Sequence, residues 1–163
     1  MRIGVVSDTH GLLRPGLLPL LAGCERILHL GDVGDDNDAG ILEALGQVAP
    51  VTAIRGNTDR AGACALLPEF EVVTVQGVSL YLLHDLHDRA RFDLDPAAAG
   101  FAAVLSGHSH QPLIEHRRGV LYLNPGSCGP RRFQLPVTCA MLTVSAAGQL
   151  HAEILTVPVA PGE

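Results

Sequence analysis

Short apolar segments recur along the chain, and five of them end at a side chain that can bind a divalent metal ion. They cover residues 2–7, 27–31, 51–56, 80–83 and 103–107. Continuous runs of valine, isoleucine and leucine are typical of strands buried on both faces, and ligands gather beyond the carboxyl ends of parallel strands in open α/β sheets. The pattern therefore predicts one shared rim for the residues that follow the runs. They are Asp8, His10, Asp32, Asn57, His84, His108 and His110.

The first half of the chain alternates these runs with helical segments. Helices are predicted over residues 14–22 and 39–45, each closed by a glycine, with Asp38 as the N-cap of the second. Crossovers of this kind force the strands that they join to be parallel. Residues 85–100 are expected to form a loop that leads into a short helix.

The second half is typical of antiparallel hairpins, because pairs of apolar runs flank short glycine-containing turns. The predicted pairs are 69–75 with 78–83, 111–116 with 120–123, and 138–144 with 150–157. A parallel unit joined to hairpins indicates an α/β fold, a four-layer αββα sandwich in which two mixed β-sheets pack face to face with helices on the outside. The length suits a single domain over residues 1–157, followed by a flexible tail over 158–163.

Composition narrows the function classes. Eleven arginines, no lysine and seventeen acids give a net charge of −6, which argues against stable binding to nucleic acid or to an anionic membrane. A small phosphorylated substrate stays possible, because bound metal ions reverse the local field. The four cysteines form no CxxC pair, and we find neither a signal peptide nor a membrane-spanning run, so free thiols in a cytoplasmic protein are expected. A hydrophobic content of 47% is compatible with a homo-oligomer.

The residues at the ends of the runs are suited to metal binding. Gly107-His108-Ser109-His110 directs two imidazoles to the same side, because alternate residues of an extended segment share a face. Carboxylate, amide and imidazole ligands together favour borderline ions such as Mn²⁺, Zn²⁺, Fe, Ni²⁺ or Co²⁺ over Mg²⁺ or Ca²⁺.

The ordered motifs DxH, GD, GNxD, H and GHxH resemble those of the calcineurin-like metallophosphoesterase family. The chain has no cap insertion. In this it resembles the small bacterial and archaeal phosphodiesterases of that family and their eukaryotic relative in the retromer coat. Residues 124–127, Asn-Pro-Gly-Ser, and the arginine that follows also match this subgroup. The resemblance covers about residues 1–155.

The resemblance implies two divalent ions, Mn²⁺ foremost, and a hydroxide that bridges them and attacks a phosphoester, most readily a phosphodiester. It assigns the first ion to Asp8, His10, Asp32 and His110, and the second to Asp32, Asn57, His84 and His108. Asp32 would thus bridge the two ions.

The chain departs from the family pattern at two places. Thr58 stands where many larger relatives have a histidine that contacts phosphate or protonates the leaving group. His84 is followed by Asp85 where the family usually has glycine, and His87 is a rival ligand. We favour His84 because it ends the apolar run.

Further candidates flank the motifs. Asn57, Asp59 and Arg55 are candidate catalytic residues, although Asp59 suits a role in orienting a ligand or its loop, and Arg55 suits a structural salt bridge equally well. Thr58, Arg131 and Arg132 are candidate substrate-binding residues. His29, inside a buried run, is expected to be a core histidine.

Two other functions compete with a phosphoesterase. A non-catalytic interaction scaffold of the same fold would be expected to lose ligands, yet all seven matched positions here hold competent residues. A nuclease is disfavoured by the acidic charge and by the scarcity of stacking side chains, with no Trp, four Phe and two Tyr. We therefore predict a small phosphoester as substrate, bound in an open, shallow cleft.

Overall fold

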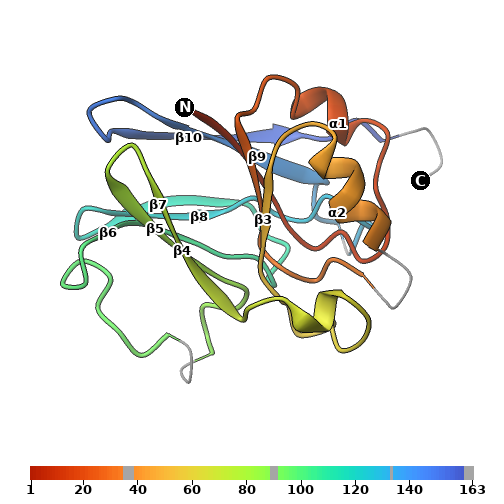
Figure 1. Ribbon diagram of the computed structural model, residues 1–163, viewed down its shortest axis with the longest axis horizontal. Coiled ribbons are helices and arrows are strands. Elements are labelled where there is room, and N and C mark those ends of the chain that lie inside the picture. The colour runs from red at the N-terminus through yellow and green to blue at the C-terminus, as the bar shows by residue number, and fades with distance from the viewer. Residues whose placement is uncertain (35–38, 89–91, 133, 160–163) are drawn as a thin grey trace.

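The computed structural model describes residues 1–34, 39–88, 92–132 and 134–159 as two five-stranded sheets packed face to face (Figure 1). Sheet A has the order β10-β9-β1-β2-β3, and sheet B has the order β4-β5-β6-β8-β7. The strands of sheet A are β1 (Arg2–Val6), β2 (Arg26–His29), β3 (Val51–Ala53), β9 (Thr138–Val144) and β10 (Leu150–Thr156). Those of sheet B are β4 (Phe70–Val75), β5 (Val78–Leu83), β6 (Phe101–Leu105), β7 (Leu113–Arg117) and β8 (Val120–Asn124).

Both sheets are mixed, as the sequence predicts. Strands β1, β2 and β3 run parallel, and so do β5, β6 and β8. The three predicted hairpins are formed by β4 with β5, β7 with β8, and β9 with β10. The parallel strands end at the same side of the sandwich, which is where the polar residues of the motifs follow them.

The main core lies between the sheets. In β1, Ile3 and Val5 face sheet B, whereas Val6 faces the opposite side, as the two-residue period of a strand requires. Across the interface, Leu80 and Leu82 of β5 are fully buried. Each such aliphatic side chain stabilises the fold by about 2 kcal/mol. This packing holds the carboxyl ends of the two parallel sets at a fixed separation.

Helices cover the outer face of sheet A. They are α1 (Leu17–Leu20) and α2 (Ala39–Gly46), and Figure 1 shows both on the sheet A side. The predicted helix over 14–22 is shorter in the structure, with Gly16 as its N-cap and Leu21 as its C-cap. Pro19 lies in its first turn, where a backbone N–H would have no partner within the helix. The expected cap Asp38 lies outside the described residues. No disulfide joins the four buried cysteines in the described part of the chain, in agreement with the prediction.

The outer face of sheet B is covered differently from the expectation. Tyr81, Val104 and Tyr122 pack there against Phe92 and Ala97, which belong to the segment that precedes β6. The short helix expected in this segment is reduced to turns, because Pro96 and Gly100 leave three alanines between them. Within residues 92–132 and 134–159 no helix is present, so this fourth layer is a packed loop.

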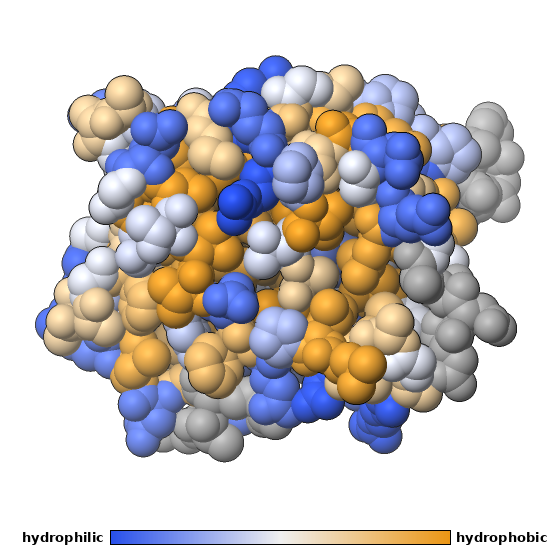
Figure 2. Space-filling model, in the orientation of Figure 1, coloured by the Kyte–Doolittle hydropathy of each residue, from blue (hydrophilic) through white to orange (hydrophobic). Residues whose placement is uncertain are grey.

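Several apolar side chains are exposed at the edge of the sandwich, on β4 and on the short 3₁₀ helix η1 (Cys64–Leu66). Of the large apolar side chains that are described, Leu66, Phe70 and Val72 are the most exposed. Figure 2 shows apolar residues spread among polar ones over this view of the molecule.

The C-terminal segment is described as far as residue 159. Residues 160–163 of the predicted tail lie outside the described residues, whereas Val157 is fully buried. None of the helices in the described part of the chain is long and apolar enough to cross a bilayer.

Candidate metal centre

The loops after β1, β2 and β6 bring four of the candidate ligands together. His110 Nε2 lies 3.2 Å from Asp8 Oδ1 and 3.4 Å from His10 Nε2. His10 Nε2 is in turn 3.8 Å from Asp32 Oδ2. Asp8, His10 and His110 therefore form one cluster of metal-ligating atoms with Asp32 beside it.

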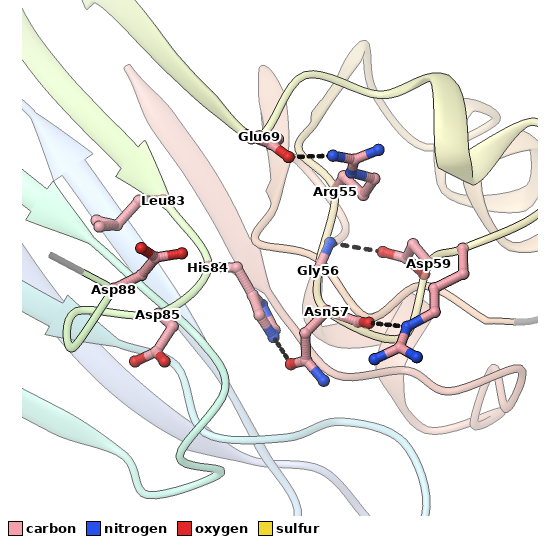
Figure 3. A pocket seen from close by; sticks show the side chains of 10 residues that line it. Arg55, Gly56, Asn57, Asp59, Glu69, Leu83, His84, Asp85 and Asp88 are labelled. Carbon is pink, nitrogen blue, oxygen red and sulfur yellow. Dashed lines mark hydrogen bonds and ion pairs between the residues drawn. The ribbon is translucent and has the colours of Figure 1, made fainter. Parts of the chain in front are cut away.

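The loops after β2, β3, β5 and β6 form a second group that shares Asp32. His84 Nε2 lies 3.4 Å from Asp32 Oδ2. It also lies 3.1 Å from Asn57 Oδ1 (Figure 3). Asn57 Oδ1 is 2.9 Å from His108 Nδ1. All seven residues that the sequence singles out are thus connected through short contacts, and Asp32 lies between the two groups.

In the second group, atoms that can only accept a hydrogen bond lie close to one another. His84 Nδ1 lies 2.7 Å from the carbonyl oxygen of Leu30, which assigns the proton of a neutral ring to Nδ1 and leaves a lone pair on Nε2. That lone pair points toward the amide oxygen of Asn57 and the carboxylate of Asp32. Ligands of one ion at about 2.1 Å lie about 3.0–3.4 Å apart, so the observed spacing fits a shared cation.

One buried polar atom in the first group also fits a cation. Asp8 Oδ1 is buried and makes no hydrogen bond within the described part of the chain. A buried carboxylate oxygen without a donor costs free energy unless a positive charge compensates it. The donor set and its burial therefore suit a divalent metal ion.

Most candidate ligands have a strained backbone. Asp8, His10, Asp32, His108 and His110 have φ angles between 43° and 66°, the left-handed region that side chains with a Cβ rarely adopt. The other non-glycine residues with positive φ among those described are Gln76 and Arg118, both in hairpin turns. Strain of this kind persists where surrounding structure enforces it, and it clusters at functional sites.

Two glycines allow the loops to approach one another. A Cβ on Gly56 would lie 2.1 Å from Asp32 Oδ1, and one on Gly107 would lie 2.0 Å from Ser7 Oγ. Any side chain at either position would displace a candidate ligand or its neighbour. The glycines of the GNxD and GHxH motifs thus have a steric reason to be glycine.

Asp59 and Thr58 support the loop after β3. The buried carboxylate of Asp59 accepts hydrogen bonds from the backbone N–H groups of Gly34 and Gly56, at 3.2 and 2.8 Å. The backbone N–H of Thr58 donates to Asp32 Oδ1 at 2.8 Å. For Asp59, this placement favours the loop-orienting alternative over direct chemistry.

The charges of the centre are coupled. Burial opposes ionisation of Asp32, but hydrogen bonds and charge from His84, with further bonds from Thr58, hold the pKa of that carboxyl well below its usual range. Burial also opposes the cation of His84, yet Asp32, Asp8 and the Leu30 carbonyl outweigh it and raise the His84 pKa. Burial lowers the pKa of His10, helped by Arg132 and opposed by Asp32. The neutral ring of His10 keeps lone pairs available to a metal.

His29 ties two of the loops together from beneath, as a core histidine. Gly31 N–H donates to His29 Nδ1 at 3.3 Å, which leaves Nε2 to donate to Thr9 Oγ1 at 2.9 Å. The Thr9 hydroxyl donates onward to the Val33 carbonyl at 2.7 Å. Complete burial lowers the pKa of His29 to about 4, so the ring is neutral at pH 7.

Comparison with known proteins is consistent with this centre. The sequence profile of the calcineurin-like phosphoesterase superfamily domain matches residues 1–147. This chain belongs to that superfamily. It is 31% identical over 167 residues to a protein of Methanocaldococcus jannaschii named as a probable metallophosphoesterase, covering 96% of this chain and 82% of that protein.

Two further proteins match this chain over most of their length. Phosphodiesterase YfcE of Escherichia coli K12 is 31% identical over 162 residues, covering 87% of each protein. Zinc-complexed Vps29 of Entamoeba histolytica shares the fold with a TM-score of 0.70 at 20% identity, covering 97% of this chain and 100% of that chain. Members of the superfamily use divalent metals, and this chain presents a set of candidate metal ligands.

Some of the remaining candidate residues lie at the centre and others lie away from it. Arg131 and Arg132 are both exposed, and a guanidinium nitrogen of Arg132 lies 3.3 Å from His10 Nε2. Arg55 forms the salt bridge with Glu69 and donates to the Ala65 carbonyl at 3.1 Å, so the structural alternative describes its placement. His87 has a side chain that is 91% exposed and does not join the centre.

A cleft of about 410 Å³ opens beside Asn57 and His84, between the loops after β3 and β5 (Figure 3). Two of the residues that line it, Arg60 and Asp85, are not among the site residues predicted from the sequence. Arg60 lines the cleft and donates through Nε to the Asn57 carbonyl at 2.9 Å. Asp85 lies with one carboxylate oxygen 3.6 Å from His108 Nε2. The arginine directly follows the GNxD motif, which was the available signal, whereas the contact of Asp85 depends on the fold.

Proposed function

We propose that this protein is a phosphodiesterase that uses two divalent metal ions, Mn²⁺ foremost, with Zn²⁺, Fe, Ni²⁺ and Co²⁺ as alternatives. Asp8, His10, Asp32 and His110 would hold the first ion, and Asp32, Asn57, His84 and His108 the second. The observation that carries the proposal is the convergence of carboxylate, amide and imidazole acceptors around Asp32 at separations of 2.9–3.8 Å. When bound, such a pair of ions supplies Lewis-acid stabilisation and an activated water for in-line displacement.

The side chains of the centre would keep the reacting groups in place. Asp32, ionised and tied to Thr58 N–H, would serve both ion sites, and the Leu30 carbonyl fixes the tautomer of His84. Arg132 beside His10 and Arg60 beside Asn57 flank the centre on its two sides. We infer that these two guanidinium groups hold the nonbridging phosphoryl oxygens, a task that suits their planar donor geometry.

Nearby hydroxyl and thiol groups are poor nucleophiles. The Ser127 hydroxyl donates to the Asp8 carbonyl at 3.0 Å, and burial raises the pKa of the Cys128 thiol to about 12. We therefore propose direct hydrolysis without a covalent enzyme intermediate. Single turnover in ¹⁸O-labelled water is expected to place one solvent oxygen on the phosphorus product, and a trapped phosphoenzyme would refute direct attack.

Thr58 has a consequence for substrate choice. Threonine cannot donate a proton as a cation, unlike the histidine that many larger relatives carry there. We propose a preference for esters with good leaving groups, chiefly phosphodiesters and aryl esters. A series of aryl phosphodiesters should give rates that rise steeply as the pKa of the leaving phenol falls, and flat rates under chemistry-limited conditions would contradict the proposal.

An interaction scaffold is the second candidate function. The similarity to Vps29 and the exposed apolar side chains of Leu66, Phe70 and Val72 favour it. The complete set of candidate ligands favours catalysis. The deciding experiment adds Mn²⁺ and follows p-nitrophenol release from bis-p-nitrophenyl phosphate by the wild type, Asp32→Asn and His108→Ala. Equal rates for all three proteins would eliminate the proposed enzyme.

A further inference from the structure

Asp85 lies between two histidines and contacts both. Its Oδ2 is 3.6 Å from Nε2 of His108. Its Oδ1 accepts a hydrogen bond from the His87 backbone N–H at 2.9 Å and lies 3.3 Å from His87 Nδ1. The Asp85 side chain is 30% exposed, so it stands at the wall of the cleft.

His108 is the imidazole of the centre that most needs orienting. Its side chain is 43% exposed, whereas that of His110 in the same motif is 8% exposed. Its backbone is fixed, because the His108 N–H donates to Asp8 Oδ2 at 3.2 Å. The ring presents Nδ1 to Asn57 Oδ1 at 2.9 Å and thereby turns Nε2 toward Asp85.

We propose that Asp85 is a positioning residue for the second cation site, an inference that rests on the proposed function. Its carboxylate keeps the His108 proton on Nε2, so the lone pair of Nδ1 points to the cation beside Asn57. A carboxylate behind a metal-bound histidine fixes the ring orientation and strengthens the ligand. The observed 3.6 Å is an ion-pair distance, and contacts of this kind tighten when the site is loaded.

The same carboxylate would also keep His87 away from the centre. Asp85 Oδ1 holds the backbone and ring of His87 on the outside of the loop. One side chain thus excludes the rival histidine and orients a candidate ligand. Glycine, which the family usually has at this position, would do neither.

The test measures Mn²⁺ binding to the whole protein by titration calorimetry and by the electron paramagnetic resonance signal of free Mn²⁺. Asp85→Gly and Asp85→Asn are expected to weaken the second equivalent about 10- to 100-fold and to change the first less than about twofold. Asp85→Asn, which keeps an acceptor oxygen, should be the milder variant. Circular dichroism establishes that each variant is folded, and Asp85→Asn keeps the test valid if Asp85→Gly is not.

Two matched control variants distinguish the positioning of His108 from a general loss of negative charge in the cleft and from loss of the His87 imidazole. Asp88→Asn removes the same charge from the wall of the same cleft, and His87→Ala removes the imidazole that Asp85 holds outside. Both controls are expected to bind the second equivalent within about threefold of wild type, well short of the change at Asp85. A loss in Asp88→Asn equal to that in Asp85→Asn would overturn the proposal in favour of bulk charge.

A spectroscopic readout tests the proton directly. Long-range ¹H–¹⁵N spectra of the zinc-loaded wild type should show the His108 proton on Nε2, and Asp85→Gly should lose this tautomer preference. A proton on Nδ1 in the wild type overturns the inference, as does unchanged second-site affinity in both Asp85 variants. If the wild type binds no second ion, the proposed function itself fails. If all the proteins bind two ions equally and hydrolyse diesters, the role of Asp85 fails alone.

Discussion

The two halves of the candidate centre differ in their access to solvent. In the first group of candidate ligands, the side chains of Asp8, Asp32 and His110 are at most 8% exposed, and that of His10 is 12% exposed. In the second, His108 is 43% exposed and Asn57 is classed as exposed. His84 is the buried member of the second group.

This difference in exposure indicates that the two groups of ligands would bind their ions with different affinities. A buried carboxylate oxygen without a hydrogen-bond donor, such as Asp8 Oδ1, is poised to bind a cation, and low local dielectric strengthens the attraction. Solvent-exposed ligands lose side-chain freedom on binding and compete with water, but they leave room for a substrate. We therefore expect a tight first ion that belongs to the fold and a weaker second ion that faces the cleft.

The largest effect is expected at the residue that the two halves share. Asp32→Asn keeps the shape of the side chain but removes the charge that both ion sites would use. We expect kcat/KM for bis-p-nitrophenyl phosphate to fall about 1,000-fold. Steady-state kinetics with added Mn²⁺ measures this loss, and both equivalents should bind more weakly in calorimetry. A loss below tenfold would mean that the two groups do not share Asp32.

The next test separates the halves by their effect on stability. Free metal at about 1,000 times its Kd raises the free energy of unfolding by about 4 kcal/mol. We expect His110→Ala to lose most of this metal-dependent gain and His108→Ala to retain most of it. Urea unfolding with Mn²⁺ and with chelator gives the gain for each protein. Equal losses in the two variants would remove the distinction between a buried and an open site.

The buried support beneath the first half should show a pH dependence. His29 titrates near 6.5 when unfolded and near 4 when folded, because burial disfavours its cation. Between these values the unfolded state binds the proton and the native state does not, so the free energy of unfolding falls as the pH falls from about 6.5 toward 4. The contribution of His29 is fully present above pH 6.5, and about 3 kcal/mol is lost across the window.

His29→Gln provides the comparison for that prediction. Glutamine does not titrate, so the difference in unfolding free energy between wild type and variant should shrink as the pH falls. Urea unfolding at several pH values, with chelator present, isolates this term from metal binding. A difference that is constant between pH 4 and 6.5 would show that His29 is not buried as a neutral ring.

The smallest expected effects concern the two arginines that flank the centre. Arg132→Ala and Arg60→Ala should each reduce kcat/KM about tenfold, since each removes one charged hydrogen-bond donor to the phosphoryl group. Arg131→Ala is the matched control, because it removes an exposed neighbour of Arg132 with the same charge. If Arg131→Ala is as slow as Arg132→Ala, general electrostatic attraction rather than a specific contact is responsible.

The sequence predicted the placement of the centre because strand ends are encoded locally. Each apolar run stops at its candidate ligand, and parallel strands bring those ends to one rim. The same local logic favoured His84 over His87, and the structure places His84 beside Asn57 and leaves His87 exposed. The pairing of the sheets followed from hairpin turns and crossovers.

Features that depend on contacts between distant segments could not be predicted. Nothing local marks Asp85 as a neighbour of His108, because β6 brings them together. The reduction of the expected helix before β6 to turns reflects aromatic packing of that segment on sheet B as well as Pro96 and Gly100. The left-handed backbone at Asp32 and His108 is imposed by the surrounding loops and carries no sequence signature, since neither residue type demands it.

That left-handed backbone also predicts how the proposed phosphodiesterase would evolve if selection for its activity ended. Glycine adopts such φ angles without the Cβ clash, a relief of about 1 kcal/mol at each position. A descendant that no longer cleaved esters would therefore gain stability by replacing Asp8, His10 or His108 with glycine. Its candidate ligands would be substituted before the residues of its hydrophobic core. The persistence of these ligands in a lineage would therefore indicate continued selection for activity.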